Sequence, residues 1–525
     1  MSAPSQSQAS PRARALFGLL FVTLLFAPLF RAGLTPLPLL TLELLAISLL
    51  GVALWNPGRI MVKAMEIIAL GLILLLPLLY LVYLPAGILE GVPGQGAYRA
   101  NLALVSGEGQ DGTLTLVALQ TQASWLVLLI PVAVFLATRS LGEQSQLRLV
   151  TLLLAVAAFQ ATLALVQFGA GQGGLLLLGF DPSGSGAAGT YPNRNHLAGL
   201  LEMTLPIALA LLLYYLGRDR GDRKRGWRRK VSFLASLRGH TALVYGALAI
   251  LLVLGIIFTR SRTGIALAML GILLTSFLYS RRIGGDNVYG PTGTLVVIVT
   301  GIGVSIGLAP VLDRFSFGGV LEDARWTISA AAVEGLATFL PFGSGPGTFP
   351  AVFPAFQPIT LGPWFINRAH NDYIEWVFGG GIPAALLILF LLGLYLFQWT
   401  RVYSRDSWSR YRFVQVAAGI GLLLLLIHEF FDYNLHTPAN MVVFALLAGV
   451  FFSDSDQADS APSRRRHKRR TPHLSGTTAG VETPTPQPSR APPPWHRSPT
   501  PSWMTPHDPS APFPPRTEDV SCLKD

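Results

Sequence analysis

Long apolar stretches alternate with short polar connections along most of the chain. A helix that crosses a bilayer needs about 20 mainly apolar residues, because its backbone must satisfy its own hydrogen bonds within the hydrocarbon. Twelve stretches meet this requirement, near residues 14–33, 35–54, 64–84, 122–138, 148–168, 197–216, 241–259, 264–280, 293–311, 374–399, 412–430 and 438–453. The pattern predicts an all-α integral membrane protein with about 12 transmembrane helices.

Three regions follow from this pattern. Residues 1–15 are polar and basic and lack a small-residue cleavage site, so we expect a cytoplasmic N-terminus and a retained first span. Residues 16–453 form the predicted polytopic membrane domain, which includes a polar loop at 312–373. Residues 454–525 are rich in Pro, Ser and Thr and contain the basic run RRRHKRR, so we expect a disordered cytoplasmic tail.

Composition supports the membrane class and argues against others. Of the 525 residues, 51% are hydrophobic and only 13% are charged, which is more apolar surface than a soluble core can bury. The net charge of +11 comes from short Lys and Arg clusters between apolar runs, a distribution that argues against nucleic-acid binding. The single cysteine, Cys522, lies in the tail and excludes a disulfide framework or a cysteine-based metal site.

The basic clusters also predict the orientation of the spans, since Lys and Arg accumulate in cytoplasmic connections. With the N-terminus in the cytoplasm, alternate connections hold the clusters, at Arg12 and Arg14, Arg59 and Lys63, Arg139 and Arg148, residues 217–230, Arg281 and Arg282, residues 401–412 and residues 464–470. The remaining connections, at 86–121, 169–195, 259–264, 312–373 and 432–438, are nearly free of such clusters. We therefore expect the chemistry of this protein to face outward.

The loop at 312–373 is the longest polar insert between the predicted spans. Loops of this length are usually functional or disordered. Its aromatic residues favour a folded lid that packs against the membrane domain, and they are Phe315, Trp326, Phe342, Phe349, Phe353, Phe356, Trp364 and Phe365. The loop also carries several of the charged residues that are the best candidates for chemistry.

The first candidate site is the sequence TRSRTG at 259–264, at the outward end of the seventh predicted span. Arg260 and Arg262 are costly to hold near lipid unless an anion or water meets them. One interpretation is an interfacial turn whose arginines extend to the membrane surface. The other is a clamp for a phosphate or diphosphate, because guanidinium groups match phosphate oxygens and stay charged.

The second candidate is Arg325 in the sequence DARWT. We expect a short helix here, with Trp326, Ala330, Val333 and Leu336 on one apolar face. Alternatively, Arg325 is a solvated residue paired with Asp323. The following sequence FGSGPGT at 342–348 suits a sharp turn and lacks the GKS or GKT ending of a phosphate-binding P-loop.

The third candidate is the sequence RAHND at 368–372, where Arg368, His370, Asn371 and Asp372 form a titratable cluster at the start of the tenth span. The alternative is helix capping by Asn371 or Asp372. The chain has no HExxH or other spaced ligand set, so we predict no metal. Two smaller candidates, at 428–436 with His436 and at 191–196, are equally compatible with caps and interfacial aromatic residues.

Six segments occur in a fixed order on these spans: YPNRNHLAGLLE, TRSRTGIALAML, DARWTISAAA, PFGSGPGTF, RAHNDYIEWVFGGGIP and FDYNLHTPAN. In this combination, over about residues 191–451, the chain resembles the O-antigen ligase and polymerase family of bacterial membrane glycosyltransferases. The ligase branch often has His-Asn, nine residues, then Gly-x-x-Gly/Thr/Tyr. Gly381 fits this pattern, whereas Ala384 departs from it and weakens the choice of ligase over polymerase.

The resemblance implies a GT-C-like all-α membrane fold whose large extracytoplasmic loop contains short helices. It implies transfer of a glycan from an undecaprenyl-diphosphate carrier to an acceptor glycan or lipid at the outer face of the bacterial cytoplasmic membrane, with no metal, nucleotide or other cofactor. On this basis His370, Arg325 and Arg262 are the expected catalytic residues. The expected substrate-binding residues are Arg260, Arg368, Asn371, Asp372 and His436.

Elementary chemistry agrees with these roles. A lipid diphosphate is already activated, so the enzyme needs cations for the leaving group and a base for the acceptor hydroxyl. We expect arginines to supply the cations and His370, oriented by Asp372, to act as the base or to position the acceptor.

Other interpretations of the sequence are a small-anion transporter of the bicarbonate type and a non-catalytic scaffold. A transporter would hold its ligands near the membrane midplane, where the sequence places few charges besides Glu43, Glu66 and Glu202.

Overall fold

The computed structural model describes residues 10–55, 62–96, 98, 100, 104, 111–170, 187–217, 235–283, 320–405 and 408–454, without the side chains of 280–283 and 320–323. All of them belong to the first of two compact units, Met1–Ala461 and Pro462–Asp525. The predicted span at 293–311, the basic run after Gly217 and the predicted tail from Ser455 onward lie outside the described residues.

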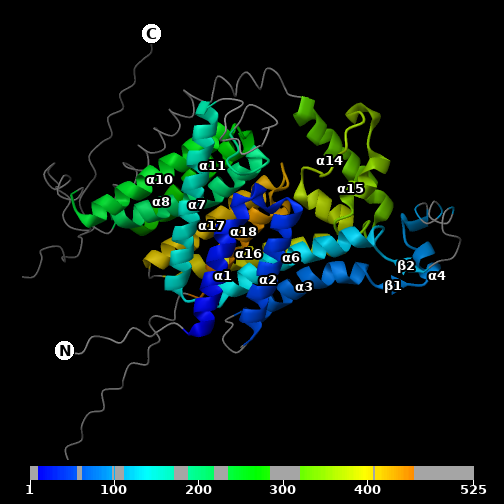
Figure 1. Cartoon of the computed structure of the whole chain (residues 1–525), viewed down its shortest axis with the longest axis horizontal. Coiled ribbons are helices and arrows are strands. Elements are labelled where there is room, and N and C mark those ends of the chain that lie inside the picture. Colours follow the sequence, from blue (N-terminus) through cyan, green and yellow to red (C-terminus); the bar gives the residue numbers. More distant parts are fainter. Residues whose placement is uncertain are drawn as a thin grey trace, which may run out of the picture. The chain divides into compact units, whose positions relative to one another are not determined.

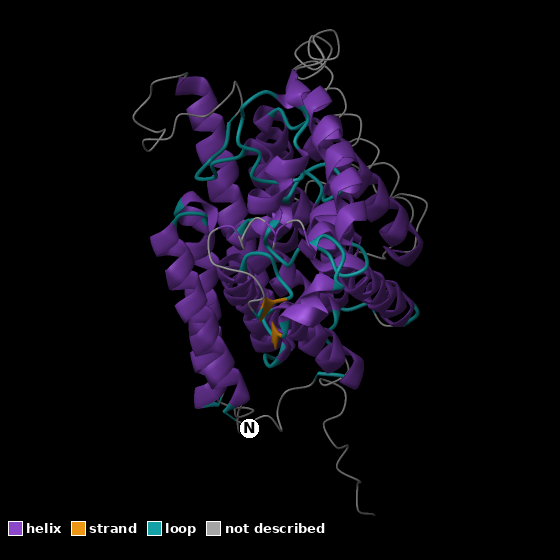
Figure 2. Ribbon diagram, turned by 90° about the vertical axis from the view of Figure 1, so that its right-hand side faces the viewer, coloured by secondary structure: helices purple, strands orange, loops and turns teal. Residues whose placement is uncertain are grey.

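Helices make up nearly all of the described structure (Figures 1 and 2). The longer helices are α1 (Pro11–Leu29), α2 (Pro36–Leu54), α3 (Ala64–Tyr80), α6 (Ala118–Arg139), α7 (Glu143–Ala170), α8 (Arg194–Gly217), α10 (Leu237–Thr259), α11 (Arg262–Ile283), α14 (Val320–Phe339), α16 (Asp372–Tyr403), α17 (Arg410–His428) and α18 (Pro438–Phe451). The short elements are α4 (Ala86–Glu90), α15 (Phe349–Val352), and the 3-10 turns η1 (Arg31–Gly33), η5 (Phe353–Phe356), η6 (Ile359–Leu361) and η7 (Asn434–His436). Strands β1 (Tyr83–Leu84) and β2 (Gly112–Thr113) pair antiparallel, with Tyr83 opposite Thr113.

The predicted all-α membrane architecture is confirmed. Nine of the described helices are long and apolar enough to cross a membrane, namely α1, α2, α6, α7, α8, α10, α11, α16 and α17. Helices α3 and α18 are apolar but shorter. Eleven of the twelve predicted spans therefore coincide with an apolar helix, whereas the count of twelve depends on the segment at 293–311, which lies outside the described residues.

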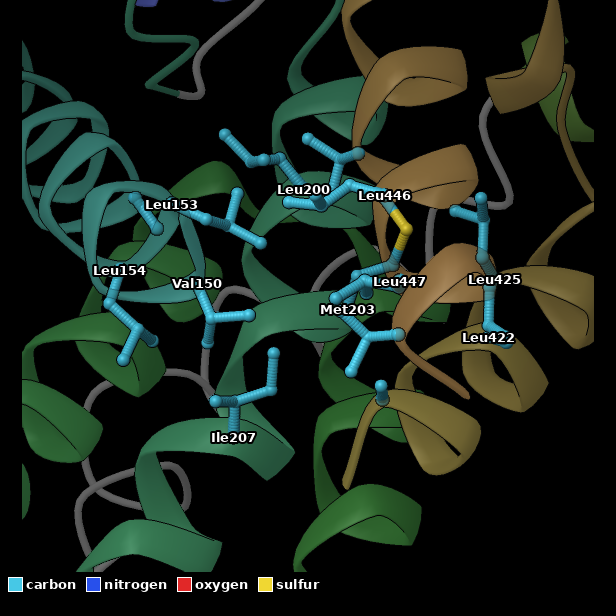
Figure 3. Close-up of a cluster of buried hydrophobic side chains, with 14 of the residues drawn as sticks. Val150, Leu153, Leu154, Leu200, Met203, Ile207, Leu422, Leu425, Leu446 and Leu447 are labelled. Atoms are coloured by element: carbon cyan, nitrogen blue, oxygen red, sulfur yellow. The ribbon is translucent and has the colours of Figure 1, made fainter. Parts of the chain in front are cut away.

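Helix α8 lies at the centre of the bundle, where its side chains from His196 to Leu211 are all buried. Figure 3 shows how Leu200, Met203 and Ile207 of α8 meet leucines of α7, α17 and α18. Small residues let these helices approach closely, since a Cβ atom added to Gly421 of α17 would lie 2.4 Å from the Met203 carbonyl oxygen. Such close packing holds helices together in lipid, where burial of apolar surface gives little driving force.

The described part of the predicted loop at 312–373 folds around its own apolar cluster. Helix α14, α15 and the turns η5 and η6 lie near one another (Figure 1) and bury Ile328, Ala331, Ala332, Phe339, Phe349 and Phe353 against Phe378 of α16. The predicted helix is present in α14, but its predicted apolar face is mostly exposed. Trp326 and Val333 are 69% and 51% exposed, Ala330 is exposed, and only Leu336 packs against the cluster.

The side of α14 that packs against the apolar cluster is decided by steric fit. The stripe of α14 that packs inward consists of smaller residues, which allow the aromatic rings of other elements to come close. A Cβ atom added to Gly335 would lie 2.9 Å from the ring of Phe356. The predicted aromatic lid is accordingly divided, because Phe349 and Phe353 are buried whereas Trp326, Trp364 and Phe365 are exposed. Phe315 lies outside the described residues.

The glycine-rich turn at 342–348 holds this region on α16. Its Ser344 and Gly345 amides donate to the carbonyl oxygens of Phe378 (3.0 Å) and Gly379 (2.8 Å). Helix α16 breaks its regular geometry at Gly381, where φ is 56° and ψ is −147°, and this kink exposes backbone groups to the turn. The turn predicted from the glycines is therefore present, and it connects the loop to the helix that begins at the third candidate site.

Candidate active site

The site is centred on Asp432, in the connection between α17 and α18. Its carboxylate is fully buried, and Oδ2 accepts a hydrogen bond from Asn195 Nδ2 at 2.7 Å. Arg325 Nη2 lies 3.6 Å from the same oxygen. On the other oxygen, Oδ1, His196 Nε2 and His370 Nδ1 each approach to 3.7 Å. The segment of Asp432 thus meets three others that are far apart in the sequence, at residues 195–196, 325 and 370.

These neighbours decide the charge of Asp432. Burial alone would raise the pKa of its carboxyl, but the neighbouring rings of His196 and His370 and the positive charge of Arg325 outweigh burial and hold that pKa well below its usual value. Asp432 is therefore ionised at neutral pH, as a buried carboxylate must be to attract a guanidinium.

Arg325 reaches the site from the first turns of α14. Its Nη1 donates to the Phe431 carbonyl oxygen at 3.2 Å, and the side chain remains about one-third exposed. The predicted alternative partner, Asp323, has a side chain outside the described residues, whereas the described partner is Asp432. The guanidinium is thus aimed by one carbonyl and one carboxylate while part of it faces out.

His370 turns its buried Nδ1 toward the carboxylate of Asp432. Its Nδ1 has no hydrogen-bond partner, since the 3.7 Å separation from Asp432 exceeds hydrogen-bond length. The ring packs edge-on against Tyr433, with centroids 5.0 Å apart. The backbone of His370 has φ of 52°, an uncommon conformation for a residue with a Cβ atom, and such strain is often found where a functional side chain is aimed.

A second group of charges surrounds His436 in η7. Its Nδ1 lies 2.7 Å from Asp372 Oδ1, and its Nε2 lies 3.2 Å from Glu375 Oε1. Glu375 Oε1 is also 2.7 Å from Arg368 Nη1. Both ring nitrogens thus face carboxylate oxygens, which are acceptors for a ring that donates from both nitrogens.

Asp372 pairs with a different histidine from the one predicted. Asp372 binds His436, and the carboxylate nearest His370 is that of Asp432, so the expectation that Asp372 orients His370 is wrong. The physical reason is direction. Asp372 is the first residue of α16, and its side chain is buried toward η7, whereas His370 lies before the helix in a left-handed conformation that turns its ring toward Asp432.

Glu429, which follows the last residue of α17, lies beside Asp372. Burial, and then the charge of the neighbouring Asp372, raises the pKa of the Glu429 carboxyl well above its usual range. Two carboxylates in contact cannot both ionise readily, so Glu429 holds a proton that it shares with Asp372. The Asp372 amide also donates to the Glu429 carbonyl oxygen at 3.0 Å, which ties α16 to the end of α17.

Asn371 has the capping role that the sequence left open. Its Oδ1 accepts from the Ile374 amide at 3.1 Å, which caps α16, and its Nδ2 donates to the Phe430 carbonyl oxygen at 3.0 Å. Both ends of the side-chain amide are therefore used by the fold.

The two arginines of the 259–264 turn lie where α10 ends and α11 begins. Arg260 caps α10 in a left-handed conformation, and its guanidinium lies 5.3 Å from the ring centroid of Phe168. Arg262 is the first residue of α11. This turn lies close to the start of α8, because a Cβ atom added to Gly264 would lie 2.6 Å from the Ala198 side chain, two residues beyond His196.

Some of the site residues were not singled out from the sequence, namely Asn195, His196, Glu375, Glu429 and Asp432. The sequence pointed to the segments at 191–196 and 428–436, but an Asp four residues beyond the end of a helix resembles a cap. The order of acidic and histidine residues in HEFFDYNLH was the available signal. Among the described residues, no group of three or more His, Cys, Asp or Glu side chains is arranged to hold a metal ion.

Comparison with known protein families gives a match to part of the chain. Residues 247–389 match the family model described as O-antigen ligase. The matched region includes Arg260, Arg262, Arg325, Arg368 and His370, and it ends before Asp432. The match supports the resemblance of the chain to the O-antigen ligase and polymerase family. No curated protein matches the chain.

Proposed function

We propose that the chain, whose residues 247–389 match the O-antigen ligase family model, is a glycosyltransferase-like membrane protein of O-antigen assembly that catalyses one specific reaction. The chain transfers a glycan from an undecaprenyl-diphosphate carrier to a hydroxyl group of an acceptor glycan or lipid. The reaction takes place at the outer face of the bacterial cytoplasmic membrane and needs no metal ion.

The convergence of Arg325 and His370 on one buried carboxylate carries this proposal. Arg325 lies 3.6 Å and His370 3.7 Å from the two oxygens of Asp432. A cation for a leaving diphosphate and a base for an acceptor hydroxyl are the two groups that such a transfer requires, and here they are neighbours.

The steps follow from these positions. The Nε2 of His370, on the opposite side of the ring from the buried Nδ1 that faces Asp432, accepts the proton of the acceptor hydroxyl as its oxygen attacks the anomeric carbon of the donor. The bond between that carbon and the diphosphate oxygen breaks, and the diphosphate leaves with the electron pair. Asp432 stabilises the imidazolium that His370 becomes.

Arginines offset the charge on the leaving group. Arg325 is partly exposed and anchored by the Phe431 carbonyl, so its remaining N–H groups are directed outward to diphosphate oxygens. Arg260 and Arg262 approach from the α10–α11 turn and complete the proposed clamp. Since His436 already serves two carboxylates, its proposed contribution is the positive charge that it adds beside the site.

A transfer assay with purified protein tests the proposal. The donor is a glycan on its polyprenyl diphosphate, and EDTA is present throughout. We expect Arg325→Ala to lose at least about 100-fold in turnover, the usual effect of removing a group that stabilises developing charge. Arg401→Ala, at the other end of α16 over Phe397, is the matched control and should transfer like the wild type.

Three results would contradict the proposal. They are full activity of Arg325→Ala, loss of wild-type activity in EDTA, and anion flux into proteoliposomes that survives both Arg325→Ala and His370→Ala. Supplying either lipid A core or a second repeat unit as the acceptor distinguishes a ligase from a polymerase.

A further inference from the structure

Between Glu334 and Arg368 the chain contains no Asp, Glu, Lys or Arg. This segment runs from the end of α14 through α15, η5 and η6 to the start of the candidate site. Soluble domains carry charge on about a quarter of their residues, so an uncharged segment of this length is unusual for a part of a protein that only water surrounds.

Within this segment, the turn at 357–365 is rigidly built. The Gln357 side chain donates from Nε2 to the carbonyl oxygens of Gly362 (2.8 Å) and Trp364 (2.9 Å). Gly362 adopts φ of 66°, which reverses the chain after η6. Leu361 and Ile366 pack inward against the cluster around Phe353. The turn is thus fixed from both sides.

This construction leaves three large apolar side chains pointing away from the protein. Ile359, Trp364 and Phe365 are 97%, 75% and 72% exposed, and we call these three residues the apolar tip. Single exposed apolar residues are ordinary, but three on one pre-formed turn indicate a surface that binds something.

We propose that the apolar tip inserts into the lipid leaflet on the side of the membrane where the candidate site lies. Trp and Phe are enriched where membrane proteins meet the lipid headgroups, and no charge in the segment opposes insertion. The tip is also close to the membrane, because Phe365 precedes Asp372, the first residue of an apolar spanning helix, by a length of chain that reaches at most about 25 Å.

A second copy of the chain fits the tip less well. A stable protein–protein interface buries about 800 Å² on each partner, and three side chains on one turn are too small for that. Insertion into lipid has no such minimum area, since each apolar side chain gains independently.

Insertion has a consequence for the site. The tip leads within a few residues to Ala369, which is buried in the same apolar cluster, and then to His370. An anchored tip therefore fixes the level of His370 relative to the lipid headgroups. The inference depends on the membrane location of the chain and does not require the proposed transfer reaction.

Fluorescence quenching in nanodiscs tests the proposal. Because Cys522 is the single cysteine, Cys522→Ser gives a background in which Phe365→Cys, labelled with the fluorophore NBD, reports on one position. The nanodiscs contain phosphatidylcholine and phosphatidylglycerol, with doxyl-lipids that quench near the headgroups or deep in the leaflet. Glu334→Cys, on the exposed face of α14, is the matched control.

We expect the label at 365 to shift to the blue and to lose most of its emission to the shallow quencher, while the label at 334 stays unquenched. Labels placed by Ile359→Cys and Trp364→Cys should behave like the one at 365, and they serve if Phe365→Cys does not fold. Gln357→Ala should reduce the quenching because the turn loosens. An unquenched, water-like label at all three positions overturns the proposal, and a blue-shifted but unquenched label assigns the tip to a protein partner instead.

Discussion

His370 Nδ1 lies 3.7 Å from Asp432 Oδ1, and Asp432 is itself fully buried at the end of a loop that follows α17. This pair places a histidine with an available nitrogen beside a carboxylate that stays ionised. The same carboxylate holds Asn195, His196 and Arg325, so a change at Asp432 reaches every group of the proposed mechanism.

Asp432→Asn tests this dependence. The amide has the size of the carboxylate but no charge, so it cannot stabilise the imidazolium of His370 or attract Arg325. We expect turnover in the transfer assay to fall by about 100-fold or more. Glu334→Gln, an equivalent neutralisation on the exposed face of α14, is the control and should leave turnover unchanged. Equal turnover in the two variants would remove Asp432 from the mechanism.

His370 and His436 should respond differently to the same substitution. His370 has an unpartnered ring nitrogen, whereas both nitrogens of His436 are held by Asp372 and Glu375. We expect His370→Asn to lose about 100-fold or more in turnover with little change in stability. We expect His436→Asn to destabilise the fold by about 2–3 kcal/mol, because two largely buried carboxylates lose the cation between them.

Thermal unfolding in detergent and the transfer assay separate these two outcomes. A stable His436→Asn protein with lost activity would instead give His436 a direct role in binding the substrate. A His370→Asn protein that is unstable would show that the ring of His370 serves mainly the fold.

Glu429 predicts a pH dependence of stability. The pKa of its carboxyl is raised in the folded protein, so the folded state binds this proton more tightly than the unfolded state does. The stability contributed by the proton is present below the ordinary Glu pKa of about 4.3 and is lost as the pH rises through the raised value. Wild-type Tm should therefore decline as the pH rises through this window.

Glu429→Gln should reduce this decline. Its side-chain amide can still donate a hydrogen bond to Asp372 but does not titrate, so the Tm of the variant should depend less on pH than that of the wild type. The measurement is Tm against pH in detergent, with Glu334→Gln as the control that keeps the wild-type slope. Identical slopes for Glu429→Gln and wild type would show that Glu429 does not hold the proton.

Asp432 makes the stability of the protein depend on pH in the opposite direction. The pKa of its carboxyl is held well below the usual range by His196, His370 and Arg325 despite burial. Its stability contribution is present above the ordinary Asp pKa of about 3.9 and is lost as the pH falls through the lowered value. The acid side of the Tm profile should therefore flatten in Asp432→Asn, while the alkaline side keeps its wild-type shape.

The spanning helices could be predicted from the sequence because hydrocarbon imposes one requirement on every residue of a span. The apolar stretch at 410–428, for example, needs no knowledge of its neighbours to be identified as a helix. The inward face of α14 could not be predicted in this way. There the choice between Trp326 and Ala332 as the buried side depends on the rings of Phe356 and Phe378, which lie on other elements.

The candidate site was predictable only in part, for a related reason. Arg325 and His370 stand out because a cation and a titratable ring in a loop rich in apolar residues need an explanation. Asp432 does not stand out, since its importance comes from Asn195, Arg325 and His370, and these approach it only in the folded chain. The predicted partner of His370, Asp372, was chosen by proximity in the sequence, and the left-handed backbone of His370 directs the ring elsewhere.

The contact between the 342–348 turn and the kink of α16 yields a final prediction, on stability. Gly345 has φ of 112°, and a Cβ atom there would lie 1.9 Å from Thr115 Oγ1. Gly345→Ala combines backbone strain with this overlap, and we expect it to destabilise the protein by about 2–4 kcal/mol. Gly393→Ala, in α16 where nothing lies within 4 Å, should be neutral or slightly stabilising.

Thermal unfolding of the two variants measures the difference, and activity gives the link to the site. The turn holds α14 and Arg325 against the helix that begins at Asp372, through the Ser344 and Gly345 amides. Loss of this attachment should therefore lower turnover even at temperatures where Gly345→Ala is folded. If Gly345→Ala matched Gly393→Ala in both Tm and turnover, the turn would not be what positions Arg325, and the anchoring of α14 would have to come from its apolar cluster alone.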